Sequence, residues 1–391
     1  MTGDEQLAAA IRRCQRRALI VGIVALVVCV IDAFFSPAQF LRSYLFAYVF
    51  WIGFPLGGMA VVMINHLTGG QWGLPIRRTL EAASRTLPLM AVLFIPIILG
   101  LPILYRWAQP AAVALDPVLK YKHPYLNDWG FIARTILYFV VWILWAYFLN
   151  RWSAQQDETG DPRLAKRLES FSGPGLVVYG LTITFASVDW VMSLEPRWYS
   201  TIYGLLFVVV EVLVAFAFAI CVARWLAQYE PLSSYVNPQQ FQDLGNLLLT
   251  FVMLWAYLSF SQFLIIWSGN LKEEISWFES RARGVWAALA IFLIVFHFFV
   301  PFLLLLSRDI KRRAKMLARV SAGLLFISLV DVYWLVVPAF QPSEPGLHLL
   351  DFAAPVAIGG IWLAAFCWQL KSRPLVPLHD PNFAEVYAHG D

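Results

Sequence analysis

Three ionisable residues, Glu211, His297 and Asp331, each lie well inside an apolar stretch that is long enough to cross a bilayer. An ionisable side chain at that depth costs about 2.5 to 3.5 kcal/mol on insertion scales, so it is rarely retained without a partner or a task. Desolvation disfavours the charged form of a buried carboxyl group and brings its proton exchange closer to neutral pH. The placement therefore predicts a polar pathway inside the membrane, and we interpret these three residues as the central part of a proton relay.

Two more acidic residues, Asp32 and Asp189, lie in the outer halves of predicted membrane spans, and we expect them to serve the outer exit of the relay. Serine and threonine residues at helical spacing, such as Ser328 three residues before Asp331, share a helix face with an acidic residue and can extend a hydrogen-bonded chain. The alternative is that these groups are neutral and hold helices together through hydrogen bonds. The residues alone leave both interpretations open.

The composition of the chain is that of a polytopic membrane protein. Of its 391 residues 60% are hydrophobic and 14% are charged, and the mean hydropathy of +0.66 is far above the range of soluble globular proteins. The four cysteines form no CxxC or CxxCH motif, only one histidine (His297) lies deep in a span, and no phosphate-binding glycine motif is present. We therefore expect no cofactor or metal in this chain, no nucleic acid partner, and redox centres only in partner subunits.

Ten segments are apolar over about 20 residues, the length of a membrane-spanning helix. They predict an all-α fold, a polytopic membrane protein with about ten transmembrane helices in a single integral membrane domain, residues 1–391, that ends in a cytoplasmic tail at 371–391. The first segment has the basic flank of a signal peptide, but it is long and lacks a small-residue cleavage site, so we interpret it as a retained anchor. The predicted spans are 18–35, 44–66, 87–107, 131–152, 174–192, 203–226, 244–267, 285–306, 316–337 and 350–370.

Most basic residues lie in loops on one side of these spans, including four arginines in the N-terminal segment and six basic residues in the run 308–319. The positive-inside rule makes this face cytoplasmic and places both termini inside. The opposite face holds the linkers 109–130, 268–283 and 338–348, which are candidate docking surfaces. We interpret the tryptophans near the span edges as interfacial anchors. They are Trp107, Trp129, Trp152, Trp198 and Trp277.

Two local features make more specific predictions. Gly53 and Gly57 form a GxxxG motif in the second span, which lets another helix approach closely; simple tolerance of glycine in a membrane helix is the alternative. After the fifth span, Pro196 is expected to end the helix and to leave Glu195 and Arg197 close enough to pair.

Four stretches of the chain carry a family resemblance. They are 189–204 (DWVMSLEPRWYSTIYG), 259–267 (SFSQFLIIW), 297–308 (HFFVPFLLLLSR) and 374–381 (PLVPLHDP). In these stretches the chain resembles the ActF family, one of two large membrane subunits of alternative complex III, a bacterial quinol:cytochrome c oxidoreductase unrelated to the cytochrome bc complexes. The chain departs from the family's pattern after Trp267, where a proline and an aromatic residue are missing, so we expect a looser turn there.

The resemblance implies a fold similar to NrfD-type subunits, with one four-helix bundle at 44–192, a second at 203–337, and peripheral first and last spans. Because the halves are offset by four spans, they would be related by an axis along the membrane normal. The resemblance also implies a bacterial inner-membrane location and a non-redox role, a transmembrane proton pathway coupled to quinol oxidation in partners. Those partners are the sister NrfD-like subunit, an iron–sulfur subunit and haem c subunits, together with membrane lipid.

Three other functions remain open. The chain could bind quinone, with a headgroup pocket near Asp189, Trp190 and Trp198 and an acid or histidine that accepts the quinol protons. It could be a secondary transporter, although its Gly and Pro interruptions form no matched pair in the two halves. It could also be an assembly scaffold with neutral buried acids.

Overall fold

The computed structural model describes residues 3–230, 232–341, 346–377 and 379 of the chain. Within this part the regular secondary structure is helical throughout, and ten segments are long and apolar enough to cross a membrane. The predicted all-α, multi-pass membrane fold is therefore confirmed. Of the predicted tail 371–391, residues 378 and 380–391 lie outside the described residues, as do residues 342–345 of the third predicted linker.

The spanning helices alternate in direction, and short helices fill the connections. The spanning elements are α1 (Gly3–Phe35), α2 (Pro37–Thr68), α3 (Arg77–Ser84) with α4 (Leu87–Leu93) and α5 (Ile95–Leu99), α9 (Asp128–Thr159), α10 (Pro162–Trp190), α11 (Tyr203–Leu226), α13 (Pro238–Gly269), α15 (Gly284–Leu293) with the π-helical turn η4 (Ile294–Phe299) and α16 (Val300–Leu306), α18 (Ala314–Val336) and α19 (Leu350–Leu370). The connecting helices are α6 (Leu101–Leu104), α7 (Pro110–Leu115), α8 (Pro117–Lys122), α12 (Leu232–Tyr235), α14 (Lys272–Arg281) and α17 (Arg308–Arg312), with 3₁₀ turns η1 (Gln71–Gly73), η2 (Arg106–Ala108), η3 (Met192–Leu194) and η5 (Val337–Ala339).

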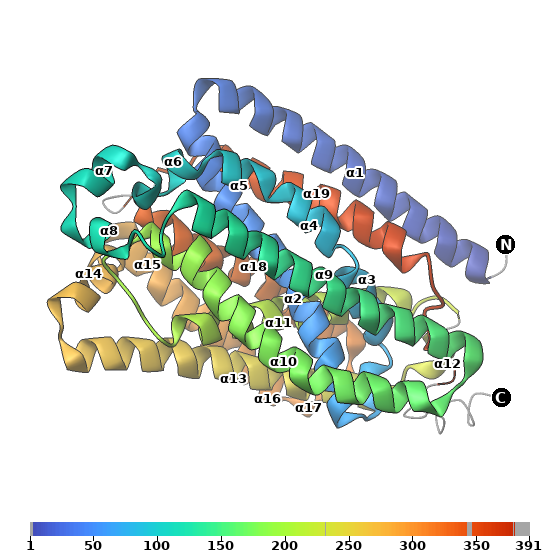
Figure 1. Ribbon diagram of the computed structural model, residues 1–391. Helices are drawn as coiled ribbons and strands as arrows, with labels where there is room; N and C mark the ends of the chain where they lie inside the picture. Colours follow the sequence, from blue (N-terminus) through green and yellow to red (C-terminus); the bar gives the residue numbers. More distant parts are fainter. Residues whose placement is uncertain (1–2, 231, 342–345, 378, 380–391) are drawn as a thin grey trace.

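The start of α1 and the end of α19 lie at the same end of the molecule, and α7, α8 and α14 lie at the opposite end (Figure 1). We call these the predicted cytoplasmic end and the predicted outer end, because the basic loops lie at the first of them. The orientation in the membrane stays a prediction from the charge distribution.

The centre of the molecule is the contact between α2 and α11, the two most buried spans. A Cβ atom added at Gly57 would lie 2.0 Å from the backbone oxygen of Glu211, so only glycine allows the two backbones to come this close. The close helix approach predicted from the Gly53 and Gly57 motif is therefore present at Gly57.

The remaining spans pack around this central pair. α10 and α3 pack on α2, with α9 against α10 and α4, whereas α13 and α18 pack on α11, with η4 and α16 against α13 and α15 against α18. α1 and α19 pack along each other at the periphery, and α19 also packs on α2. The division into bundles at 44–192 and 203–337 stays a prediction, because α2 and α11 share one core.

The third span differs from its prediction as a helix over 87–107. It starts earlier, at Arg77, and is broken into α3, α4 and α5, with α6 following. Pro88, Pro96 and Pro102 each stand at the second position of a short helix, where the missing backbone N–H breaks no internal hydrogen bond.

The interpretation of the edge tryptophans as interfacial anchors is wrong for four of the five. Trp107, Trp152, Trp198 and Trp277 are buried against the chain itself, and only Trp129 is exposed. The linkers of the predicted outer end explain the burial of Trp107, Trp198 and Trp277, because α7, α8 and α14 fold back over the ends of the spans (Figure 1). Trp152 lies at the predicted cytoplasmic end, where Phe171 and Arg167 of α10 pack against its ring. Trp198 and Trp277 stack on each other, with ring centroids 4.7 Å apart.

Replacement of Gly57 by alanine should destabilise the protein by about 1 to 3 kcal/mol, because the added methyl group must push α2 and α11 apart. The thermal unfolding midpoint of the purified protein in detergent measures this effect. Gly180→Ala is the matched control, since a Cβ atom at this glycine of α10 meets nothing within 4 Å. Equal midpoints for the two variants would show that the backbones are not in tight contact.

Candidate functional site

His297 lies in η4, where the helix widens from the α to the π form for one turn. Residue 301 is a proline, so it cannot donate the backbone hydrogen bond that the carbonyl group of His297 would accept in an α-helix. Single π turns occur frequently at functional sites. Here the turn places the imidazole inside the protein, where it is fully buried.

Three other buried side chains surround this imidazole. Its Nε2 atom lies 3.2 Å from the hydroxyl of Ser328, and its Nδ1 atom lies 3.9 Å from Oδ2 of Asp331. The indole of Trp255 donates a hydrogen bond of 3.1 Å to the same carboxyl oxygen, and its ring centroid is 4.1 Å from that of the imidazole. We call Trp255, His297, Ser328 and Asp331 the His297 cluster.

The His297 cluster places an imidazole close to a carboxyl group without a direct hydrogen bond between them. The distance of 3.9 Å to Asp331 is too long for a hydrogen bond but is within the range of an ion pair, should the imidazole be protonated. The Nδ1 atom of His297 has no hydrogen-bond partner in the described part of the chain. Two of the predicted relay residues, His297 of η4 and Asp331 of α18, thus lie close together. Ser328, predicted to share a helix face with Asp331, contacts the same imidazole.

A cavity of about 620 Å³ adjoins the His297 cluster, between α13, α14, α15 and α18. Its walls are mainly aromatic and aliphatic, and its polar lining includes Asp331, Gln262 and Arg281. The amide oxygen of Gln262 is buried and has no partner among the described residues. Two of the apolar lining residues, Phe260 of α13 and Ile291 of α15, are exposed on spanning helices. The cavity therefore opens on the apolar surface that these spans present to the membrane.

Arg281 of α14 closes the predicted outer end of this cavity. The guanidinium group is 1% exposed, and its Nη2 atom lies 2.9 Å from Oε1 of Glu195 and donates to the carbonyl oxygen of Leu335. It also lies over the ring of Trp277, at 3.8 Å from the centroid. Burial lowers the pKa of Arg281, and the carboxylate of Glu195 opposes that shift.

The predicted pairing of Glu195 with Arg197 is therefore wrong. Arg197 instead lies 3.0 Å from Asp116 at the start of α8. The reason is tertiary, because α14 folds back over the connection after α10 and brings Arg281 to Glu195.

Glu211, the third predicted member of the central relay, lies apart from the His297 cluster. Its Oε2 atom accepts a hydrogen bond of 2.7 Å from the hydroxyl of Tyr179, and the residue is buried at the contact of α11 with α2 and α10. Within the described residues it makes no hydrogen bond or ion pair with His297 or Asp331. The buried ionisable residues of the spans therefore form separate sites rather than one continuous row.

Asp189 is held in a buried ion pair. Arg134 of α9 donates two hydrogen bonds of 2.9 Å to its carboxylate, and the hydroxyl of Tyr138 donates a third of 2.8 Å. Arg134 is not among the site residues predicted from the sequence. The sequence does indicate the pairing, because Arg134 lies inside the fourth predicted span at the same outer depth as Asp189 in the fifth.

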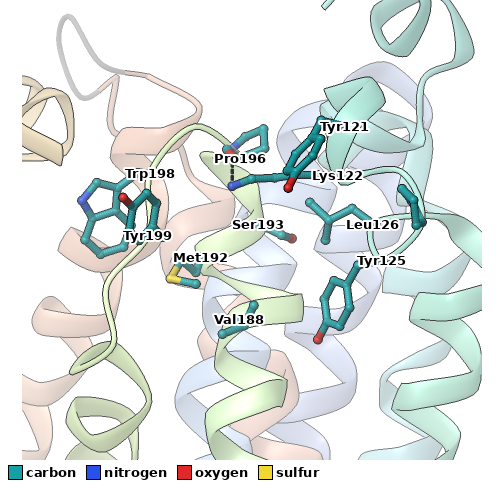
Figure 2. A pocket seen from close by; sticks show the side chains of 11 residues that line it. Tyr121, Lys122, Tyr125, Leu126, Val188, Met192, Ser193, Pro196, Trp198 and Tyr199 are labelled. Carbon is teal, nitrogen blue, oxygen red and sulfur yellow. Dashed lines mark hydrogen bonds between the residues drawn. The ribbon is translucent and has the colours of Figure 1, made fainter. Parts of the chain in front are cut away.

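A recess lined by Val188 and Met192, close to Asp189 in the chain, differs from the predicted headgroup pocket. The recess has a volume of about 390 Å³. Figure 2 shows Trp198 and Tyr199 on one side of it and Tyr125 and Leu126 on the other. Neither Asp189 nor Trp190 lines this recess. The indole of Trp190 instead donates a hydrogen bond to the hydroxyl of Thr135 in α9. The amine of Lys122 donates a hydrogen bond to the carbonyl oxygen of Pro196 (Figure 2). Burial lowers the pKa of this amine.

Asp32 lies on the peripheral helix α1 and is half-buried. One of its carboxyl oxygens is buried without a hydrogen-bond partner in the part of the chain that the structure describes. α1 packs mainly on α19, so Asp32 joins none of the other predicted relay residues.

The fold and these sites define an all-α, multi-pass membrane protein with buried ionisable residues in its spans. No protein-family model matches the chain, and no curated protein matches it. The likeness to the ActF family thus stays an expectation from the sequence. No group of three or more histidine, cysteine, aspartate or glutamate side chains that could hold a metal ion occurs among the described residues.

Replacement of Asp189 by asparagine should lower the free energy of unfolding by about 3 to 5 kcal/mol, because it leaves the guanidinium group of Arg134 without its counter-ion. Asp116→Asn is the matched control. It removes an ion pair whose arginine, Arg197, is 70% exposed, and should cost less than about 1 kcal/mol. Unfolding in mixed micelles measures both, and similar losses would show that the Arg134–Asp189 pair is not buried in the membrane-embedded protein.

Proposed function

We propose that this chain is a membrane subunit of a quinol:cytochrome c oxidoreductase of the alternative complex III class, and that it conducts protons along α13, η4 and α18. The likeness at 189–204, 259–267 and 297–308 supports the class. The His297 cluster supports the proton pathway and is the observation that carries the proposal. Quinol oxidation and electron transfer belong to the haem c, iron–sulfur and sister NrfD-like partners.

The inner half of the pathway follows the polar face of α18. At the predicted cytoplasmic end the amine of Lys311 is buried and donates a hydrogen bond of 2.7 Å to Asn246 of α13. Ser321 follows on α18 with a fully buried hydroxyl that has no partner among the described residues. It lies two helical turns, about 10.5 Å, from Ser328, so the proposal requires water molecules to carry protons between the two hydroxyl groups.

The outer half runs through the His297 cluster. A proton reaches the imidazole beside Ser328 and passes to the carboxyl group of Asp331, which lines the cavity. The Arg281–Glu195 pair is the next charged group toward the predicted outer end. The Tyr179–Glu211 pair lies outside this row, and Asp189 is held by Arg134, so the proposal assigns neither of them a step.

A quinone site is the second candidate, and the cavity beside Asp331 favours it over the region near Asp189. Its volume of about 620 Å³ is in the range of small-molecule sites, about 300 to 1,000 Å³, and it opens on the apolar surface. Asp331 and Gln262 are the polar groups that could bind a headgroup. A quinol oxidised there would release two protons, the first to Asp331, and two electrons to a redox centre of a partner.

In the assembled complex, reconstituted into vesicles, Asp331→Asn and His297→Gln should each reduce proton translocation per quinol oxidised at least tenfold, because each removes a group that binds the proton. Quinol oxidation and haem content should persist in both. Ion-sensitive dyes and cytochrome reduction measure the two rates together. Undiminished translocation in Asp331→Asn, or loss only in Glu211→Gln, would contradict the proposed route.

Ala290→Trp should abolish labelling of the cavity by a photoreactive quinone analogue, because Ala290 lines the cavity and an indole would fill it. Ala288→Trp, an exposed position on the same helix, is the matched control and should be labelled like the unaltered chain. Mass spectrometry locates the label. Labels confined to the sister subunit would remove the quinone candidate and leave the proton pathway untouched.

A further inference from the structure

A recess of about 380 Å³ at the predicted cytoplasmic end has three arginines in its walls. Arg85 follows α3, Arg151 belongs to α9, and Arg373 lies in the segment after α19. Tyr147, Asn150, Gln155 and Glu158 of α9 contribute the remaining polar lining. Three parts of the chain that are distant in sequence thus meet around a basic recess.

Two guanidinium groups of the recess have unused donors. Arg85 donates to the hydroxyl of Ser372 and to the carbonyl oxygen of Gln369, both at 2.8 Å, but its buried Nε atom has no hydrogen-bond partner in the described chain. The buried Nη1 atom of Arg373 also lacks a hydrogen bond, and its closest carboxylate, Glu81, is 3.9 Å away. Buried donors of this kind are normally satisfied, and charged donors most readily by an anion.

The charged groups behind the recess do not neutralise it. Arg78 is shared between Glu81 and Asp157, and Glu81 also pairs with Arg77. Arg151 and Glu158 lie at the open side, where both are exposed. Five guanidinium groups therefore stand against three carboxylates, which leaves an excess of two positive charges. The charged groups are Arg77, Arg78, Arg85, Arg151, Arg373, Glu81, Asp157 and Glu158.

The surroundings of the recess indicate where the anion comes from. α9 presents an exposed apolar face toward the membrane side of Arg151, with Leu144 and Tyr147 about half exposed, and α4, which packs beside α9, exposes Val92. The recess thus lies where an apolar helix surface meets a basic end of the protein, which is the depth of lipid headgroups. Basic pockets at the cytoplasmic ends of membrane helices are a known setting for anionic lipid headgroups.

We propose that this recess binds the headgroup phosphate of an anionic phospholipid, with the acyl chains along the exposed face of α9 and α4. The phosphate oxygens accept hydrogen bonds from Arg85 and Arg373, and Arg151 faces the headgroup from the open side. The lipid thereby ties the segment after α19 to α3 and α9, and it stabilises this end of the fold. The proposal is independent of proton conduction, which is proposed to use α13, η4 and α18 rather than α3, α9 and the segment after α19.

The test is the thermal unfolding midpoint of the full-length purified chain in neutral detergent, titrated with phosphatidylglycerol, phosphatidylcholine or inorganic phosphate. A ligand that binds only the folded state raises the stability of that state. The unfolding midpoint should therefore rise with the concentration of phosphatidylglycerol until the site is saturated. Phosphatidylcholine with the same acyl chains should not. In Arg85→Gln/Arg373→Gln the concentration of phosphatidylglycerol at half-saturation should rise at least tenfold.

Arg312→Gln/Arg319→Gln is the matched control, because it removes two exposed arginines from the same predicted face at a distance from the recess. Its titration should match that of the unaltered chain. Arg151→Glu provides a variant that disturbs no buried contact and should weaken the response at least threefold, even if the double variant fails to fold. An equal response to phosphatidylcholine, an unchanged response in Arg151→Glu, or the whole effect produced by inorganic phosphate would each overturn the assignment to a phospholipid.

Discussion

A polar group inside a bilayer must find its partner within the protein, and this constraint shapes the sites of Asp189, Glu211 and Asp331. Asp189 takes Arg134 and Tyr138, Glu211 takes Tyr179, and Asp331 takes Trp255. Each pair joins different helices, so the polar contacts also specify which spans lie side by side. The apolar surfaces between them are much less selective, because lipid chains solvate them as well as other helices do.

The close approach of α2 and α11 is the second condition for this arrangement. Gly57 lets α2 lie directly on the backbone of α11 at Glu211, which is also where the carboxyl group turns toward Tyr179 of α10. The polar groups of α18 and η4 lie on the other side of α11, where α13 and α18 pack. The central helix pair therefore separates the environment of Glu211 from that of His297.

The surroundings of Asp189 and of His297 differ in how their buried polar atoms are paired. Around Asp189 both carboxyl oxygens are hydrogen-bonded, which is the pattern of a structural ion pair. Beside the cavity, His297 Nδ1 and Gln262 Oε1 are buried without hydrogen-bond partners among the described residues. Unpaired polar groups are costly in stability, so their position beside the cavity is the physical argument for a function at the His297 cluster.

The order of the residues determined the membrane character of the chain, its spans, and the burial of Glu211, His297 and Asp331, because hydropathy is a local property that depends on composition over about 20 residues. The third predicted span was wrong because prolines break it, and several helices extend beyond their predicted edges, for example α1 from Gly3 and α10 from Pro162. Which ionisable groups meet was decided by the tertiary structure: Arg134 reaches Asp189, Arg281 reaches Glu195, and Glu211 stays apart from His297. Depth can be read from a sequence, but the rotation and neighbours of each helix depend on close packing among residues far apart in the chain, which no local pattern specifies.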